Sequence, residues 1–413
     1  MSYKVGKPRF TTAKWLAVVG IGEDGPAGLE PTARELIADA AVVFGARRHL
    51  ELAASLIAGE PRPWPVPFDS SVPAVLALRG SPVCVLASGD PMLFGVGATL
   101  ARLVDPAEMM VLPTSSAFSL AAARLGWALQ DIECVSLHGR PISLIRPLLH
   151  PGRRIVALTS DGAAPAAIAQ LLLETGFGPS ALHVLEALGG SGEAIHRLSA
   201  AEIGERKFAS LNTLAIEVAG LANAQILPLA TGLPDALFEH DGQITKRDIR
   251  ALTLSALAPR RGELLWDIGA GSGSVAIEWM LTHPSLRAVA VEADTARAAR
   301  IARNAVALGV PGLQVAELRA PEALAGLPVP DAVFIGGGGS DPGVMDALIA
   351  ALRPNGRLVA NAVTLEMEAV LLSRHARSGG ELVRIAVSRA APLGSMSAWR
   401  PAMPVTQWRW IKP

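Results

Sequence analysis

The sequence predicts a two-domain α/β protein, and three observations support this fold class. The chain has 413 residues, and a single hydrophobic core rarely exceeds about 250–300 residues. Half of the residues are hydrophobic and only 18% are charged, which provides apolar material for two cores and argues against disorder. Short apolar runs of strand length alternate with longer helical patterns, which is typical of parallel sheets covered by helices.

The first half of the chain follows this alternating pattern. Pro31 and Thr32 open a helix. Strands are expected at residues 15–19, 42–44, 83–87, 154–158, 181–185 and 213–218. The stretch from 219 to about 245 contains several proline and glycine residues and interrupts the pattern, which indicates a linker and a docking loop.

The alternating pattern resumes in the second half. A helix at 246–257 precedes a strand at 263–268, and a glycine loop then leads to a helix at 274–281. Further strands are expected at 288–291, 332–335 and 357–360. Because the glycine loops of the two halves differ in kind, we expect two different folds and not a duplicated domain.

Composition narrows the range of functions. Basic and acidic residues both number 37, so the zero net charge gives no bulk attraction to nucleic acid or to an anionic membrane. No apolar run reaches the roughly 18 residues that span a bilayer, and the N-terminus lacks the apolar segment of a signal peptide. We therefore expect a cytoplasmic protein with no nucleic-acid or membrane partner. Cys84 and Cys134 lack the spacing of a metal site, so no metal is expected.

A glycine loop with an acid before it marks the first candidate site. Asp267 ends a strand pattern, and Gly269-Ala270-Gly271-Ser272-Gly273 then leads into a helix. Glycines let the backbone turn sharply and approach a ligand closely, and the helix N-terminus presents free N–H groups. The next strand ends at Glu292, about 25 residues after Asp267, where an acid can bind both hydroxyls of an adenosine ribose.

Two classes of ligand fit this layout. A dinucleotide fingerprint would place its third glycine at Ser274, but that glycine comes one residue earlier, which disfavours a nicotinamide oxidoreductase. The observed Asp-x-Gly-x-Gly-x-Gly form is similar to motif I of the class I methyltransferases, which bind S-adenosylmethionine. Asp267 would then hold the methionine end of the ligand or a bridging water. The glycines at 336–339 and the stretch from Asn361 follow later strands and are expected to face the same crevice.

A second candidate site lies in the first half, where three groups of residues follow predicted strands. They are Gly20 with Gly22; Gly89, Asp90, Pro91 and Phe94; and Ser115 with Ser116. Taken alone, Gly-Asp-Pro is an ordinary turn. Parallel sheets bind ligands at the carboxyl ends of their strands, so the three groups together indicate a binding site.

The second half resembles a specific family. Its residues from about 236 to 413 are similar to the C-terminal domain of the precorrin C5,15-methyltransferases of the cobalamin pathway, and to the separate decarboxylating cobalt-precorrin enzymes. The matching stretches are 240–247, 267–273, 291–294, 319–324, 335–339 and 361–366. The resemblance implies that S-adenosylmethionine contacts Thr245, residues 269–273, Glu292 and Ala320. Leu318 and Arg319 stand where many relatives have a Gly-Asp pair, which leaves the adenine contacts there open.

The first half resembles the tetrapyrrole methyltransferases of the class III type, whose fold differs from the Rossmann-like class I fold. The resemblance covers about residues 14 to 220, and its most distinctive stretches are 44–50, 115–116 with 122–126, and 136–141. It implies an S-adenosylmethionine site at the three groups of residues named above. Arg47, Arg48 and Arg140 could pair with substrate carboxylates, and His49 and His138 could be functional or structural.

The two resemblances together imply a fused bifunctional enzyme of the precorrin family. The expected domains are 14–220 for methylation at C-5, a linker at 221–235, and 236–413 for methylation at C-15 with loss of the C-12 acetate carboxyl. The implied substrate is a reduced precorrin-6, the product is precorrin-8, and each domain takes one S-adenosylmethionine. Neither half shows a triad, a carboxylate pair or a metal cluster, so the catalytic residues stay unassigned. We also expect a homo-oligomer, with Trp399, Trp408 and Trp410 in packing or an interface.

Two other interpretations stay open. The chain could be a class I methyltransferase acting on RNA or protein, although the zero net charge and the lack of a basic-aromatic tract disfavour nucleic acid. Alternatively, the N-terminal domain could be a non-catalytic ligand-binding module beside a class I methyltransferase with another substrate.

Overall fold

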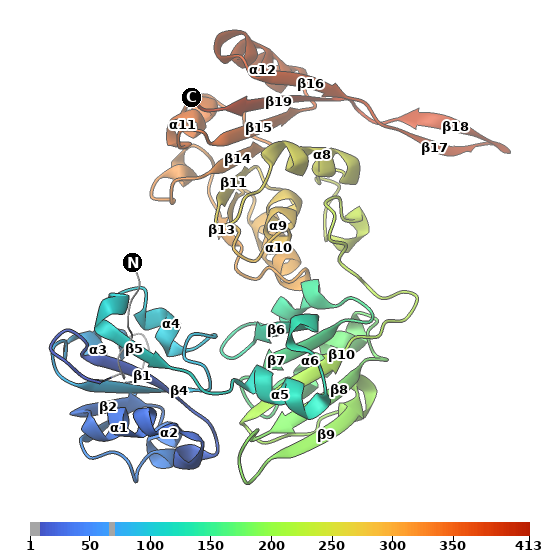
Figure 1. The fold of residues 1–413 in the computed structure, drawn as a ribbon. Coiled ribbons are helices and arrows are strands. Elements are labelled where there is room, and N and C mark those ends of the chain that lie inside the picture. The colour runs from blue at the N-terminus through green and yellow to red at the C-terminus, as the bar shows by residue number, and fades with distance from the viewer. Residues whose placement is uncertain (1–8, 66–70) are drawn as a thin grey trace. The chain divides into compact units, whose positions relative to one another are not determined.

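A computed structural model describes residues 9–65 and 71–413 of the protein (Figure 1). The first eight residues, on which the expectation of no signal peptide partly rests, lie outside the described part. The chain divides into two compact units. The first comprises residues up to Ile142 with His150–Gln225, and the second comprises Ser143–Leu149 with Ile226–Pro413.

The first unit begins with a parallel five-stranded sheet of order β3-β2-β4-β1-β5. Its strands are β1 (Leu16–Ile21), β2 (Val42–Gly45), β3 (Glu60–Pro63), β4 (Val83–Ser88) and β5 (Met109–Leu112). Helices α1 (Pro31–Asp39) and α2 (Arg47–Leu52) cover one face, and α3 (Ser71–Leu76) and α4 (Val96–Leu100) cover the other. The central strands are buried on both faces, which explains their continuous apolar runs.

The second sheet of this unit is mixed, with order β6-β7-β10-β8-β9. Its elements are β6 (Ile132–Ser136), β7 (Arg154–Leu158), β8 (Ala181–Glu186), β9 (Ala194–Ser199), β10 (Asn212–Glu217), α5 (Ala117–Leu125), α6 (Ala164–Glu174) and α7 (Ala200–Ile203). Only β6 and β7 pair in parallel. The expectation of parallel strands is therefore wrong for this sheet. Residues 187–193 between β8 and β9 are too few for the crossover of a dozen or more residues that parallel neighbours need.

The second unit contains a seven-stranded sheet of order β13-β12-β11-β14-β15-β19-β16. Five strands are parallel: β11 (Leu264–Ile268), β12 (Arg287–Val291), β13 (Gln314–Ala316), β14 (Ala332–Ile335) and β15 (Arg357–Ala362). The antiparallel strands β19 (Val405–Ile411) and β16 (Glu381–Ile385) complete the sheet. The chain reverses its direction of winding between β11 and β14, and open α/β sheets bind ligands at such a point.

Helices cover both faces of this sheet. One face carries α8 (Arg247–Leu257), α9 (Ser274–Leu281) and α10 (Thr295–Ala307), and the other carries α11 (Val344–Ala351) and α12 (Leu365–Ser378). Short 3₁₀ helices lie at Gly25–Gly28, Pro106–Glu108, Leu129–Asp131, Ile142–Leu148, Asp235–Leu237 and Glu322–Leu324. Among the described helices, none has the length and apolar character to cross a bilayer.

The C-terminal tryptophans have two different environments. Trp408 and Trp410 lie in β19, pack in the core and stack with ring centroids 5.9 Å apart. Trp399 lies in a two-stranded hairpin, β17 (Ser388–Leu393) and β18 (Met396–Pro401), and 75% of its surface is exposed. Figure 1 shows this hairpin extending away from the seven-stranded sheet of its own unit.

Candidate functional site

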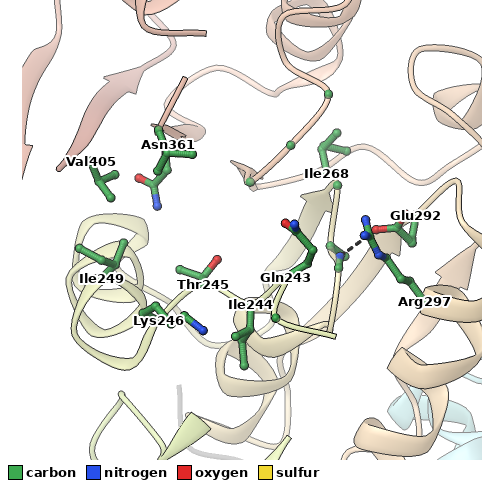
Figure 2. Close-up of a pocket in the computed structure, with 18 of the residues that line it drawn as sticks. Gln243, Ile244, Thr245, Lys246, Ile249, Ile268, Glu292, Arg297, Asn361 and Val405 are labelled. Carbon is green, nitrogen blue, oxygen red and sulfur yellow. Dashed lines mark hydrogen bonds between the residues drawn. The ribbon is translucent and has the colours of Figure 1, made fainter. Parts of the chain in front are cut away.

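A pocket of about 640 Å³ opens at the carboxyl ends of the parallel strands in the second unit (Figure 2). This volume is in the range of roughly 300–1,000 Å³ that small-molecule sites occupy. The loops after β11, β12, β14 and β15 line it, together with residues 242–246, which precede α8. The pocket therefore lies at the switch point that the strand order defines.

Glycine is required in the loop after β11. Gly269 and Gly271 adopt φ values of +64° and +60°, which favour glycine. A Cβ on Gly269 would lie 2.7 Å from the Cα of Gly337, and one on Gly271 would lie 3.1 Å from the carbonyl oxygen of Gln243. The loops after β11 and β14 thus pack backbone against backbone and leave space for a ligand.

The five residues of the predicted glycine loop, 269–273, have two kinds of position. Gly269, Ala270 and Gly271 line the pocket. Ser272 is buried, and Gly273 forms the N-cap of α9 against the side chain of Ile301. The structure thus places three of the five predicted residues at the pocket and gives the other two a supporting position.

Glu292, the predicted ribose-binding acid, follows β12 and lines the pocket. Its Oε2 accepts a hydrogen bond from the backbone N–H of Gly271 at 2.8 Å (Figure 2). Its Oε1 accepts one from the N–H of Asp294 at 3.0 Å. The carboxylate therefore holds two pocket loops together and retains acceptor capacity for ligand hydroxyls.

Asp267 does not line the pocket. It is buried beneath the glycine loop with 1% of its surface exposed. Its Oδ2 accepts the N–H of Ala276 at 3.0 Å, and within the described residues Oδ1 has no hydrogen-bond partner. Burial raises the pKa of Asp267 to about 7, and the nearby charge of Glu292 adds to this, while the Ala276 N–H opposes it. A buried carboxylate with a free oxygen fits a nearby cationic or donor-bearing ligand.

Thr245 lines the pocket from the segment that joins the linker to α8. Its carbonyl oxygen accepts a hydrogen bond from the guanidinium of Arg250, a residue with no exposed surface. Arg250 also donates to Glu278 at 2.5 Å, to Asp235 at 3.0 Å and to the Leu233 carbonyl. The carboxylate of Glu278 in turn accepts backbone N–H groups of residues 232 and 233. This buried ion pair therefore anchors both ends of the segment 232–245, while Arg297, Arg300, Arg303 and Asn304 hold its middle through Glu239 and Asp241.

Sequence reasoning missed this ion pair. Glu278 is the only acid in the apolar helix α9, and a buried acid there requires a partner. That signal was available in the sequence, but the identity of Arg250 as the partner was not.

Ala320, a predicted contact of the methyl donor, is buried and lines the pocket. The two residues that depart from the family pattern also line it. Leu318 is exposed, and Arg319 forms an ion pair with Asp341 at 3.8 Å. Asn361, at the end of β15, faces the same pocket from the side opposite Glu292 (Figure 2).

In the first unit, the three predicted groups meet at the carboxyl edge of the parallel sheet. A Cβ on Gly20 would lie 1.9 Å from the carbonyl oxygen of Gly89, which accepts the N–H of Thr114 at 3.2 Å. Gly89 has a φ of +57°, and a Cβ there would lie 2.9 Å from the Cα of Ser116. The loops after β1, β4 and β5 therefore pack so closely that only glycine fits at these two positions.

The remaining predicted residues surround this contact. Asp90 accepts the N–H of Met92 at 2.8 Å and forms the turn after β4. Ser116 caps α5 by accepting the N–H of Ser119. Gly22 and Ser115 lie in the adjoining loops, Pro91 packs against Gly95 and Gly97, and the Phe94 ring lies 5.8 Å from that of Phe118.

A polar cluster lies beside this edge. Arg48 pairs with Glu23 and donates to the Oγ of Ser88 at 3.1 Å. His49 Nε2 lies 2.8 Å from the same oxygen and 3.1 Å from an Arg48 nitrogen. Burial and, to a lesser degree, the Arg48 charge lower the pKa of His49 to about 4. His49 therefore acts in the structure as a neutral acceptor that orients Arg48 and Ser88.

Comparisons with known proteins agree with this division of the chain. Residues 16–204 match the family of tetrapyrrole (corrin/porphyrin) methylases, and residues 236–412 match the precorrin methyltransferase domain. A precorrin-6Y C(5,15)-methyltransferase (decarboxylating) from Sinorhizobium sp is 63% identical over 398 residues, which cover 96% of each chain.

Two shorter relatives come from Salmonella typhimurium. A cobalt-precorrin-6B C(15)-methyltransferase (decarboxylating) is 34% identical over 42% of this chain and 92% of its own length. A cobalt-precorrin-7 C(5)-methyltransferase is 30% identical over 44% of this chain and 90% of its own length.

The two folds and their matching families define an S-adenosylmethionine-dependent methyltransferase with two methyltransferase domains. The predicted fold class, a class III tetrapyrrole methyltransferase fold followed by a Rossmann-like class I fold, is confirmed. The chain belongs to the family of the precorrin-6Y C(5,15)-methyltransferases (decarboxylating).

Proposed function

We propose that this chain methylates a reduced precorrin-6 at C-5 and C-15 and removes the carboxyl group of the C-12 acetate, giving precorrin-8 in cobalamin biosynthesis. The observation that carries this proposal is the presence, in one chain, of two domains whose families are otherwise found with the separate C(5) and C(15) activities. We assign methylation at C-5 to residues 14–220, and methylation at C-15 with decarboxylation to residues 236–413, with a linker at 221–235.

Each methyl transfer is a displacement at the methyl carbon of a sulfonium. The carbon–sulfur bond breaks as a bridging carbon of the macrocycle forms the new carbon–carbon bond. The protein's task is to hold the acceptor carbon in line with the methyl group and to exclude water. In the second unit, the loop 269–271 and Glu292 would hold the donor, with Thr245 and Ala320 on the walls of the pocket.

The decarboxylation breaks the bond between the acetate methylene carbon and its carboxyl carbon. Carbon dioxide leaves, and the electron pair of the broken carbon–carbon bond is taken up by the conjugated macrocycle. A proton then takes the place of the carboxyl group. We propose that the macrocycle itself is the electron sink. A requirement of the purified active protein for a metal or an organic cofactor would overturn this part of the proposal.

We further propose one S-adenosylmethionine site per domain. In the first unit, the close contact of Gly20, Gly89 and Ser116 supports a site formed by the predicted residues, namely Gly20, Gly22, Gly89, Asp90, Pro91, Phe94, Ser115 and Ser116. Isothermal titration calorimetry should give two equivalents per chain. A single equivalent, lost in a Gly271→Val variant, would instead favour a class I methyltransferase with a non-catalytic N-terminal domain.

We also propose that the protein forms a homo-oligomer through the hairpin β17–β18. Both edges of a two-stranded ribbon offer unpaired backbone groups, and Leu393, Met396 and Trp399 are exposed on it. Sedimentation velocity should show an oligomer that a Trp399→Ser variant weakens. A monomer in both cases would contradict the proposal. The cytoplasmic location expected from the sequence stays a prediction.

A further inference from the structure

The outer part of the pocket is not accounted for by the residues assigned to the methyl donor. It is formed by α8, by the ends of β15 and β19, and by the base of the β17–β18 hairpin. Its wall combines the apolar side chains of Ile249, Val363 and Val405 with Asn361 and three charged groups. Two of these, Arg389 and Asp248, form an ion pair with each other, and the third is Lys246. Figure 2 shows Asn361, Ile249 and Val405 on one side of the pocket and Glu292 with Arg297 on the other.

Hydrogen bonds fix the orientation of the Asn361 amide. Arg409 Nε donates to Gln407 Oε1 at 2.7 Å. A guanidinium can only donate, so this contact identifies the oxygen of the Gln407 amide. Gln407 Nε2 therefore donates to Asn361 Oδ1 at 2.9 Å. By the same logic, the Asn361 nitrogen is the atom that donates to Thr253 Oγ1 at 3.0 Å.

The network has little freedom to rearrange. Gln407 has no exposed surface, and Thr253 is also fully buried. Arg409 is held in turn by Glu381, whose Oε2 accepts from it at 3.0 Å. Turning the Asn361 amide over would place its N–H groups against the Nε2 donor of Gln407, which costs the desolvation penalty of unsatisfied buried groups.

One N–H of Asn361 is left for a ligand. The amide nitrogen carries two hydrogens, and Thr253 takes one of them. Among the described residues, the amide makes no further hydrogen bond, and Asn361 lies on the pocket wall. Lys246 lines the same pocket and forms no ion pair with any described carboxylate, so its positive charge is also available.

The chemistry of the substrate matches this arrangement. The relatives are named as decarboxylating, so their substrate carries at least one carboxylate. A fixed amide donor and an unpaired ammonium group in one pocket, with apolar side chains between them, suit a carboxylate attached to a macrocycle.

We propose that Asn361 donates its free N–H to a carboxylate of the precorrin in the C-terminal site. Gln407 and Arg409 are positioning residues that fix the direction of this donor, and Lys246 supplies a positive charge in the same pocket. This inference rests on the function proposed above, because it needs the C-terminal site to hold the precorrin.

The first experiment measures both methylations in Asn361→Ala and Asn361→Asp variants of the full chain. We expect kcat/KM of the C-15 reaction for the precorrin to fall about 10- to 100-fold in the alanine variant, as for a lost hydrogen bond to a charged group. The aspartate variant should fall further, because it places a negative charge beside the carboxylate. The KM for S-adenosylmethionine in the C-15 reaction and the rate of C-5 methylation should stay within about twofold of the unaltered chain.

The positioning role is tested with a double-mutant cycle. Gln407→Glu keeps the acceptor for Arg409 but removes the donor to Asn361, so it should lower C-15 kcat/KM on its own. In the Asn361→Ala background, the same change should have almost no further effect, because Gln407 acts through Asn361. Additive losses would show that Gln407 acts independently and would overturn this part of the inference.

Two further outcomes are decisive. Equal C-15 kinetics in the Asn361→Ala and unaltered chains would contradict this inference but leave the proposed function intact. A loss of S-adenosylmethionine binding as large as the loss of C-15 activity would also overturn it, since it would show a general disturbance of the pocket. If the unaltered chain forms no C-15 product, the proposed function itself fails.

Discussion

At the scale of single residues, burial shifts the pKa values of Asp267 and His49 in opposite directions. Both are buried, and burial disfavours the charged form of each, so the pKa of the acid rises to about 7 and that of the base falls to about 4. Both lie where a sheet edge forms a candidate site. Their protonation should therefore report on ligand binding in one domain and on stability in the other.

Asp267 should release a proton when S-adenosylmethionine binds. The ligand's positive charge would favour the carboxylate and lower its pKa from about 7. Below pH 7 the affinity of the C-terminal site should therefore rise with pH, by up to about tenfold per pH unit. Calorimetry in buffers of different ionisation enthalpy measures the protons released per chain.

The matched variant for this prediction is Asp267→Asn, which keeps the size of the side chain and removes its titration. Proton release by the C-terminal site should disappear in it. Equal release in both chains, or affinity that does not change between pH 5.5 and 7, would contradict a role for Asp267 near the cationic ligand.

His49 should make the stability of the first unit depend on pH. Its pKa is lowered on folding from 6.5 to about 4, so the unfolded chain takes up a proton that the folded chain does not. The associated stability is fully present above pH 6.5 and is lost as the pH falls toward 4. Between pH 7 and pH 5 the loss should be about 2 kcal/mol. Denaturant unfolding at both pH values measures it, and a His49→Gln variant should show a smaller difference. An identical difference in the variant would assign the effect to other groups.

At the scale of elements, the buried pair Arg250–Glu278 links helices α8 and α9 to the segment 232–245. This segment contributes Gln243, Ile244 and Thr245 to the pocket. The pair therefore helps to hold one wall of the donor site in place, although neither residue lines the pocket.

A Glu278→Gln variant should weaken methyl-donor binding in the second unit only. It leaves the charge of Arg250 without its main buried partner, which typically costs about 3–5 kcal/mol of stability. The KM for S-adenosylmethionine should rise in the C-15 reaction and stay unchanged in the C-5 reaction. Kinetics of the two methylations in one sample measure this difference.

Glu263→Gln provides the control. Glu263 pairs with Arg357, which is also buried, and this pair makes no contact with the segment 232–245 among the described hydrogen bonds. It should lower stability without a selective change in donor KM. The same donor KM in both variants would show that Arg250–Glu278 has only a general structural role.

Local patterns allowed several elements to be predicted with their boundaries. The strands at 154–158 and 332–335 and the helix at 274–281 are observed over the same residues. The direction of β8–β10 was predicted wrongly, and the strands β16–β19 were not predicted. The hairpin β17–β18 is largely exposed, and β19 pairs with β15 more than forty residues away, so the local pattern carries little information about the partner.

The parts of the two candidate sites also differ in how far the sequence predicts them. Glycines at 20, 89, 269 and 271 could be predicted as site residues, because a close approach of two backbones requires glycine, and glycine is recognisable in the sequence. The links from Arg250 to Glu278 and from Arg409 through Gln407 to Asn361 could not. They depend on which polar side chains meet inside the fold, and no spacing in the sequence encodes this.

At the scale of the whole molecule, the chain joins two units of different fold, and each has its candidate site within its own sheet. A substitution that inactivates one site should therefore leave the other site active. Gly271→Val introduces a Cβ at a positive φ in the second unit, and Gly89→Val does the same in the first.

We expect Gly271→Val to stop methylation at C-15 and Gly89→Val to stop methylation at C-5. A mixture of the two variant proteins should then restore the complete product, because each supplies the domain that the other lacks. A mixture that stays inactive, with both variants folded by circular dichroism, would indicate a single shared site.

The mass of the product tests the central claim most directly. The unaltered chain is incubated with S-adenosylmethionine and a reduced precorrin-6, and the corrin product is analysed by mass spectrometry. Two methyl transfers and one decarboxylation predict a product that gains two methyl groups and loses one carbon dioxide. A product that keeps its carboxyl group, or that gains only one methyl group, would contradict the account.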